Sequence, residues 1–283
     1  MKPIIKYRGG KSKEIHLLTP YIPRYAGKYI EPFFGGGAMY FHLEPKQALI
    51  NDINTKLMNF YSAVQQNYLE LSKELAQLEE IYTENRKAFD ALKKERPNER
   101  VEDKNEALYY KLRDMYNGLT IPKYSKAALY YFINKTAYSG MIRFNSKGEY
   151  NVPYGRYKNF NTSLITEKHH QLLSNTEIHN SDYSEIFAHT EPEDFIFLDP
   201  PYDCIFSDYG NDEHKDGFSE ANHRQLASDF QNLNCRALMV IGATPLTREL
   251  YGGMIVAEYD KNYAVNIRNR FHAEAIHLIV TNY

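Results

Sequence analysis

Apolar runs that end in polar or glycine-rich turns recur near the start of the chain. Residues 28–34 form one such run before the glycines at 35–37, and residues 47–50 form a second run before the polar pair at 51–52. The residues at 38–43, between the two runs, have the character of a helix start. Strand, glycine loop, helix, strand and acid in this order are typical of the first half of a nucleotide-binding α/β unit.

The middle of the chain has a helical pattern instead. Leucines recur at helical spacing from about residue 67, and residues 101–117 have a further apolar helical side. The charged, proline-containing stretch 93–100 between them is typical of a solvated connector. Residues 138–157 resemble a turn-rich hairpin, because Ser146-Lys147-Gly148 separates two short runs of strand-forming residues.

The α/β pattern returns after about residue 165. Residues 194–198 have the composition of a buried strand, and residues 237–241 and 276–281 predict further strands. The whole pattern therefore predicts one α/β sheet that is interrupted by a long, mainly helical insertion.

The composition is that of a globular protein, with 43% hydrophobic and 25% charged residues, and it excludes a disordered chain. The apolar run 237–241 is too short to span a bilayer, and the first residues lack the apolar stretch of a signal peptide. The two cysteines, Cys204 and Cys235, cannot build a disulfide framework or a cysteine-rich zinc site. The ten histidines have no metal-ligand spacing. We therefore expect a cytoplasmic protein that uses no metal and contacts no membrane.

The charged residues are distributed unevenly along the chain, so the net charge alone does not describe the electrostatic character of the protein. With 34 basic and 36 acidic residues the net charge is −2, which taken alone argues against a nucleic-acid partner. Residues 1–30, however, carry seven basic residues and one acidic residue, and residues 108–160 carry nine basic and two acidic residues. The second segment also holds ten of the 25 tyrosines. Rings interleaved with lysine and arginine suit contacts to bases, sugars and phosphates, so the arrangement favours a polyanionic partner.

The most informative short motif is Asp199-Pro200-Pro201-Tyr202, which directly follows the strand expected at 194–198. Ligands of an open α/β sheet bind at the carboxyl ends of its strands. There the Asp199 carboxylate and the Pro200 carbonyl can accept both hydrogens of a planar exocyclic amine, which favours a tetrahedral nitrogen and absorbs developing positive charge. Tyr202 offers a ring on which a planar base can stack. Such chemistry needs no metal, no cysteine and no covalent intermediate.

The glycine loop and the acid after the second strand suit a cofactor that donates a methyl group. S-adenosylmethionine carries no phosphate, so no phosphate-binding lysine loop is required. The glycines at 35–37 would let the backbone approach this cofactor closely. Asp52 follows Glu31 by 21 residues and ends the second strand, which is the usual place of a ribose-hydroxyl acceptor.

Five motifs in this order resemble those of the Dam-like (D12 class) DNA adenine-N6 methyltransferases. They span residues 6–11, 31–37, 51–54, 151–157 and 199–202. The resemblance implies a Rossmann-like, S-adenosylmethionine-dependent methyltransferase sheet with an inserted, mainly helical target-recognition domain that contains the hairpin. Residues 1–64 and 165–283 would form the catalytic domain, and residues 65–164 would form the recognition insertion.

The same resemblance implies roles for individual residues. Glu31 would face the methionine amino end of the cofactor, and Asp182 would lie near the adenine amine of the cofactor. Asp199, Pro200 and Tyr202 would hold the target adenine once it has been flipped out of the duplex. The implied cofactor-binding residues are Tyr7, Lys11, Glu31, Gly35, Gly37, Asp52, Asp182 and Asp199.

The implied DNA-reading residues lie in the hairpin of the insertion. Arg156 is expected to read a guanine edge with two hydrogen bonds. Its expected neighbours on the DNA-facing side are Tyr138, Met141, Arg143, Asn145 and Pro153. The segment 148–156 resembles that of family members which modify adenine in the site GATC.

Two alternatives remain open at this point. The same fold and related tetrapeptides serve cytosine-N4 and RNA methyltransferases, and a catalytically inactive DNA-binding module would keep the basic segments. The sequence also leaves open whether the protein is paired with a restriction endonuclease, regulates replication or belongs to a phage.

Overall fold

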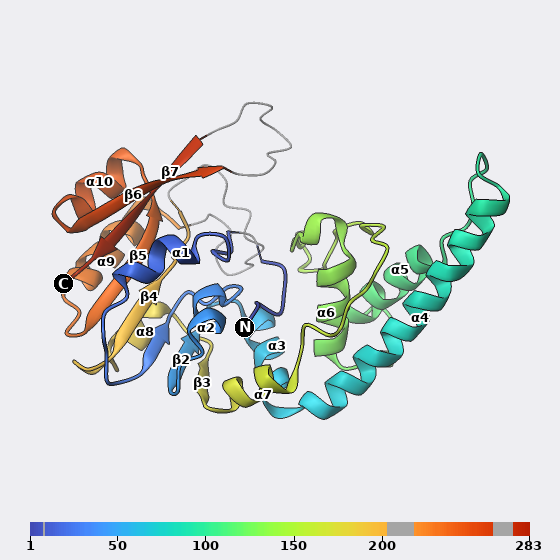
Figure 1. Cartoon of the computed structure of the whole chain (residues 1–283), viewed down its shortest axis with the longest axis horizontal. Coiled ribbons are helices and arrows are strands. Elements are labelled where there is room, and N and C mark those ends of the chain that lie inside the picture. Colours follow the sequence, from blue (N-terminus) through green and yellow to red (C-terminus); the bar gives the residue numbers. More distant parts are fainter. Residues whose placement is uncertain (8, 203–217, 263–273) are drawn as a thin grey trace. The chain divides into compact units, whose positions relative to one another are not determined.

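The computed structural model describes residues 1–7, 9–202, 218–262 and 274–283. The chain divides into two compact units (Figure 1). Residues 1–10 and 56–175 form the first, which we call the helical unit. Residues 11–55 and 176–283 form the second, which we call the sheet unit.

Among the described residues, the sheet unit contains seven strands in the spatial order β3-β2-β1-β4-β5-β7-β6. The first five in this order are parallel to one another, and β7 is antiparallel to both β5 and β6. The mostly parallel sheet confirms the predicted Rossmann-like α/β fold. The strands are β1 (Tyr29–Glu31), β2 (Ala48–Asn51), β3 (Thr176–His179), β4 (Phe195–Leu198), β5 (Arg236–Gly242), β6 (Ile255–Asn262) and β7 (Glu274–Thr281).

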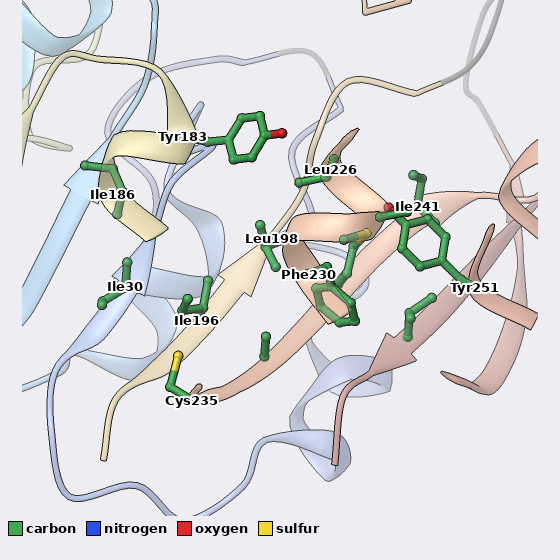
Figure 2. Packing of buried hydrophobic residues seen from close by; sticks show 14 of the residues in the cluster. Ile30, Tyr183, Ile186, Ile196, Leu198, Leu226, Phe230, Cys235, Ile241 and Tyr251 are labelled. Carbon is green, nitrogen blue, oxygen red and sulfur yellow. The ribbon is translucent and has the colours of Figure 1, made fainter. Parts of the chain in front are cut away.

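Helices cover both faces of this sheet, and alternate residues of a strand point to opposite faces. On one face Ile196 and Leu198 of β4 join a buried cluster with Tyr183, Leu226 and Tyr251 from three helices (Figure 2). On the other face the rings of β1 and β4 pack against each other and against α2. The helices of the unit are α1 (Ile15–Leu18), α2 (Ala38–Leu43), α8 (Tyr183–Phe187), α9 (Glu220–Gln231) and α10 (Pro245–Tyr251), with short 3-10 turns at Thr19–Tyr21 and Gly252–Met254.

The helical unit packs around one central helix. Every residue of α6 from Ala127 to Thr136 is buried, including the aromatic residues at 130–132. Leu71, Leu75 and Leu78 form the apolar side of α4. The helices are α3 (Thr55–Gln66), α4 (Tyr68–Glu95), α5 (Lys104–Tyr116), α6 (Lys126–Thr136) and α7 (Glu167–Ser174), with a 3-10 turn at Tyr138–Gly140.

The hairpin expected at 138–157 is present as a short one around the predicted turn at 146–148. Phe144 bridges Tyr150, the Asn145 N–H donates to the Glu149 carbonyl at 2.9 Å and the Asn151 N–H donates to the Arg143 carbonyl at 3.2 Å. The N–H and carbonyl of Tyr150 point away from the opposite arm, as in any non-hydrogen-bonded antiparallel pair, and a distant side chain takes them. The Asn117 amide accepts from the Tyr150 N–H at 2.8 Å and donates to the Tyr150 carbonyl at 3.0 Å.

The predicted insertion, residues 65–164, lies inside the helical unit, which extends to 56–175 and also includes residues 1–10. The assignment of catalysis to residues 1–64 and 165–283 and of recognition to the insertion stays a prediction. No helix in the described ranges combines the length and apolar character that crossing a membrane requires.

Candidate active site

Three predicted acids lie at one edge of the sheet. β1 ends at Glu31, β2 is followed by Asp52 and β4 is followed by Asp199. The three strands are parallel neighbours, so their carboxyl ends meet at the same edge. The strand order reverses between β1 and β4, which is where open α/β sheets bind ligands.

Glu31 is a buried carboxyl held by neutral donors. It is 2% exposed, accepts a hydrogen bond from Tyr29 Oη at 2.6 Å and receives another from the Tyr40 backbone N–H. Burial raises the pKa of Glu31 to about 8, and the charges of Asp199 and Asp52 add to the rise. No described side chain forms an ion pair with it. A buried carboxyl of this kind fits a cationic group brought by a ligand, such as an α-ammonium.

The glycine loop is shaped by its own contacts. Gly35 and Gly37 have φ values of 48° and 63°, in the left-handed region that favours glycine. The Gly35 N–H donates to Asp52 Oδ2 at 2.9 Å, which ties the loop after β1 to the end of β2. A Cβ on Gly37 would lie 2.4 Å from the Phe34 ring, so packing explains this glycine. The structure thus brings together Glu31, Gly35 and Asp52.

Asp182 has a structural task in addition to its predicted one. Its Oδ1 accepts from the Ser184 N–H at 3.0 Å and caps α8. Two asparagines that the sequence did not single out tie its loop to the end of β2. Asn51 exchanges hydrogen bonds with the Ser181 backbone, and Asn180 Nδ2 donates to the Asp52 carbonyl at 2.8 Å.

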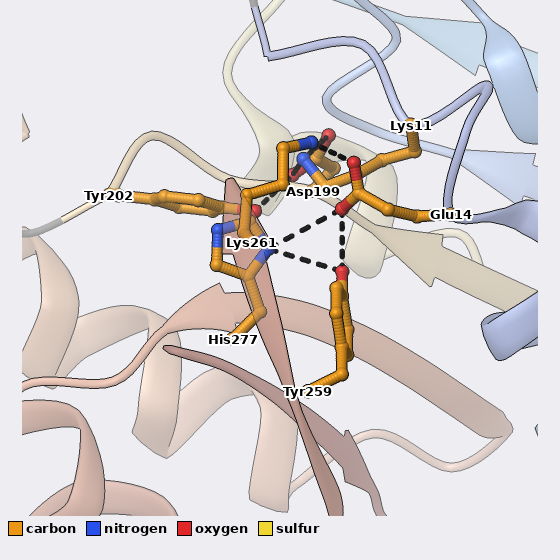
Figure 3. A network of polar contacts seen from close by, with 7 residues as sticks. All are labelled: Lys11, Glu14, Asp199, Tyr202, Tyr259, Lys261 and His277. Carbon is orange, nitrogen blue, oxygen red and sulfur yellow. Dashed lines mark hydrogen bonds and ion pairs between the residues drawn. The ribbon is translucent and has the colours of Figure 1, made fainter. Parts of the chain in front are cut away.

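The catalytic motif is ion-paired with the first basic segment. Lys11 Nζ lies 2.7 Å from Asp199 Oδ1 and 2.8 Å from Asp199 Oδ2, and the lysine is 3% exposed (Figure 3). Tyr202 Oη donates to Asp199 Oδ1 at 3.2 Å. Pro200 is buried beside them. The structure therefore brings Lys11, Asp199, Pro200 and Tyr202 into one place.

A second polar group, which we did not predict, adjoins this pair (Figure 3). Buried Glu14 forms an ion pair with Lys261 and accepts from Tyr259 Oη at 2.7 Å. His277 Nδ1 lies 3.1 Å from Tyr259 Oη. Burial lowers the pKa of His277 to about 4, and the positive charges of Lys11 and Lys261 lower it further. Its imidazole is therefore neutral near pH 7.

No motif marked this second group, because its members come from distant segments. One signal was present in the sequence. Glu14 is the single acidic residue of segment 1–30, which holds seven basic residues, and it pairs with the half-buried Lys261.

The predicted DNA-reading residues belong to the helical unit. Arg156 is 69% exposed, with φ of 54° and a 3.6 Å contact to Glu106. Asn145 is used by the turn, since its Oδ1 accepts from the N–H groups of Lys147 and Glu149. Tyr138, Arg143 and Pro153 are exposed, and Met141 is half-buried.

Tyr7 and the two cysteines are the other residues named in the sequence analysis. Tyr7 also belongs to the helical unit, and its carbonyl accepts from the Gly10 N–H at 3.4 Å. Cys204 lies outside the described residues, and Cys235 is buried. Within the described ranges, no three histidine, cysteine or acidic side chains are grouped so that they could hold a metal ion.

The chain is similar along its whole length to proteins named type II methyltransferases. It is 32% identical to M.CviBI of Paramecium bursaria Chlorella virus NC1A, with 100% of both chains covered. It is 30% identical to M.MjaIII of Methanocaldococcus jannaschii, with 100% of this chain and 99% of the relative covered. A DNA adenine methylase of Salmonella typhi is 26% identical over 88% of this chain and 84% of its own length.

The sequence profile of one protein family covers nearly all of the chain. It is described as D12 class N6 adenine-specific DNA methyltransferase, and it matches residues 7–267. The match includes the glycine loop, the acid after β2 and the Asp199–Tyr202 motif. With its parallel sheet and the three acids at the edge of that sheet, the chain belongs to the D12 class of N6 adenine-specific DNA methyltransferases.

Proposed function

We propose that this adenine-specific DNA methyltransferase binds S-adenosylmethionine at the carboxyl ends of β1 and β2 and modifies an adenine that has been flipped out of the duplex. The observation that carries the proposal is the ion-paired Asp199, with Tyr202 bonded to it, at the strand edge that also holds the buried Glu31. Base flipping follows from access, because the N6 amine of a stacked base cannot reach such a site.

Each proposed cofactor-binding residue is matched by its chemistry to one part of S-adenosylmethionine. The buried Glu31 carboxyl is suited to the α-ammonium, and the Asp52 carboxylate is suited to the ribose hydroxyls. Gly35 and Gly37 leave room for the backbone to approach. Tyr7, Lys11, Asp182 and Asp199 complete the proposed set, in which Asp182 takes the adenine amine of the cofactor. When bound, S-adenosylmethionine supplies an electrophilic methyl group.

The target adenine is held by the catalytic tetrapeptide. Asp199 and the Pro200 carbonyl accept the two N6 hydrogens, so the nitrogen lone pair is freed from the ring and directed at the methyl carbon. Bound S-adenosylmethionine would give up the methyl carbon by cleavage of its bond to sulfur and would leave as S-adenosylhomocysteine, and the Asp199 carboxylate would accept the proton that N6 loses. Lys11 holds both oxygens of that carboxylate, which fixes its orientation. Tyr202 stacks on the base.

We propose that Arg156, with Tyr138, Met141, Arg143, Asn145 and Pro153, reads double-stranded DNA at GATC. The names of two relatives as type II methyltransferases support a pairing with a restriction endonuclease. The cytoplasmic location stays a prediction.

A nucleoside assay tests the proposal. Duplexes that contain GATC, and duplexes with each base of the site replaced, are incubated with the protein and S-adenosylmethionine and then analysed by mass spectrometry. N6-methyladenine confined to the GATC duplex is the expected product. Methylation of another site would refute GATC, and N4-methylcytosine or methylated RNA would refute the acceptor.

A pair of variants tests the role of the tetrapeptide. Asp199→Asn should abolish methyl transfer but leave the protein folded, because the carboxylate is replaced by an amide of the same shape. Asp260→Asn, on an exposed position of β6, is the matched control and should keep full activity. Turnover retained by Asp199→Asn would exclude the proposed mechanism.

A further inference from the structure

The ring of Tyr202 rests on the backbone of β5. A Cβ built on Gly242, the last residue of β5, would lie 3.3 Å from Tyr202 Cδ2 and 3.6 Å from Tyr202 Cγ. Real Cβ atoms rarely come this close to a neighbouring atom. The glycine therefore lets the tyrosine ring lie nearer to the strand than any other residue would allow.

The edge of the same ring contacts His277. The two ring centroids are 5.0 Å apart and the planes are at 85°, which is the favoured edge-to-face geometry of aromatic pairs. His277 is 1% exposed. Tyr202 is thus contacted from two directions by residues that lie outside the catalytic motif.

These contacts come from one row of cross-strand partners. Gly242 of β5 is registered with His277 of β7, and His277 is registered with Tyr259 of β6. Thr247 Oγ1 donates to the Gly242 carbonyl at 2.8 Å, which fixes the end of β5. Residues in such a row share one face of the sheet, so they move together with it.

Polar contacts fix the rotation of the His277 ring. His277 Nδ1 lies 3.1 Å from Tyr259 Oη and 3.5 Å from Glu14 Oε2, and Tyr259 Oη donates to Glu14, so the Nδ1 edge of the imidazole is held toward these two side chains. Lys261 balances the charge of Glu14. Glu14, Tyr259 and Lys261 therefore hold the His277 imidazole in place. The imidazole in turn packs against the edge of the Tyr202 ring.

We propose that Gly242 and His277 form a seat that sets the plane of the Tyr202 ring and thereby the stacking of the flipped adenine. Both are positioning residues, because they act through Tyr202 and not on the substrate. The inference rests on the proposed function, in which Tyr202 stacks on the target base. It adds that β5 and β7, which hold none of the five motifs named in the sequence analysis, determine how well the base is held.

The test uses duplexes with 2-aminopurine at the target adenine. The fluorescence lifetime of this base is short when it stacks on a ring and long when it is extruded without a partner. With wild-type protein and S-adenosylmethionine we expect a large short-lived fraction. Tyr202→Ala should convert it to the long-lived form, and this variant defines the effect of losing the ring.

Gly242→Val should lengthen the lifetime and weaken the extruded complex about tenfold, within the range known for base–aromatic stacking. Gly242→Ala should have a smaller effect of the same sign. The control is Gly253→Val, because no described atom lies within 4 Å of a Cβ at that glycine. His277→Ala should resemble Gly242→Val, whereas His277→Phe, which keeps a ring at the contact, should restore most of the short-lived fraction.

Double variants distinguish the loss of Tyr202 positioning from a general structural defect. In the Tyr202→Ala background Gly242→Val and His277→Ala should have no further effect on lifetime or on kcat, because the ring they position is gone. Full additivity, or single variants with wild-type lifetimes, would overturn the seat. Calorimetric S-adenosylmethionine affinity should be unchanged in folded variants. If Gly242→Val does not fold, the 2-aminopurine lifetimes of Gly242→Ala and of the two His277 variants test the proposal in its place.

The two proposals fail in different ways. If wild-type protein transfers no methyl group to the duplex adenine, the proposed function is wrong. If wild-type protein is active and its lifetimes match those of the seat variants, the proposed function stands and the seat is wrong.

Discussion

Glu31 makes the folded protein less stable as the pH rises, and this effect can be isolated. The pKa of Glu31 is raised from 4.5 to about 8, mainly by burial. The folded protein therefore keeps a proton that the unfolded chain releases, and stability falls with pH between these two values. Below pH 4.5 both states are protonated and the penalty is absent. Glu31→Gln removes the titration, so it should stabilise the protein more at pH 7 than at pH 5.

The size of the effect follows from the pKa values. One pKa unit corresponds to about 1.4 kcal/mol, so the interval from 4.5 to pH 7 is worth about 3 kcal/mol in the free energy of unfolding. At pH 5 the same substitution should change this free energy by less than about 1 kcal/mol. An unpaired amide hydrogen in the variant would subtract equally at both pH values. The diagnostic quantity is therefore the difference between them, about 2–3 kcal/mol.

Urea unfolding followed by circular dichroism at pH 5 and pH 7 measures this difference. Glu193→Gln, at an exposed position before β4, is the matched control and should show none. The Glu31 variant should also lose S-adenosylmethionine binding, because the amide cannot pair with an ammonium. A gain in stability that is the same at both pH values would refute the protonated, buried state of Glu31.

Three further predictions concern the cofactor and the DNA. Tyr29→Phe removes the 2.6 Å hydrogen bond to Glu31 and should weaken S-adenosylmethionine binding tenfold or more, because Glu31 must ionise to pair with the ammonium and a bond to a charged group is worth about 1.5–3 kcal/mol; unchanged calorimetric affinity would contradict this. Arg156→Ala should cost about 1–3 kcal/mol of discrimination at one guanine, measured as kcat/KM on a panel of substituted sites; an unchanged preference would reject the contact. DNA affinity should fall steeply with salt despite the net charge of −2, whereas a flat response would count against the basic segments as the DNA footprint.

The sequence predicted the acidic and catalytic residues of the candidate site, but it did not predict the residues that hold them in position. Glu31, Asp52 and Asp199 could be found because each ends or directly follows an apolar strand, and parallel strands bring such residues to one edge. Lys11 could be found because it closes a motif. These positions are marked by local pattern, which a single sequence displays.

Residues that meet through strand pairing could not be found in this way. Gly242, His277 and Tyr259 are neighbours only because β7 lies between β5 and β6 in antiparallel register. The short hairpin around residues 146–148 could be predicted, because its turn residues are a local pattern. Its anchoring by the distant Asn117, which bonds the outward-facing N–H and carbonyl of Tyr150, could not.

The place at which the helical unit enters the chain has an evolutionary consequence. Its main segment, residues 56–175, is inserted between β2 and β3, which are paired neighbours in the sheet. None of the strands β1, β4, β5 and β7 is interrupted. Under the proposed function, in which the helical unit carries the DNA-reading residues, recombination at these two points would exchange one DNA specificity for another and leave the chemistry intact. Because the Lys6 backbone pairs with the Asn134 side chain, such a chimera must inherit the first ten residues from the same parent as the insertion.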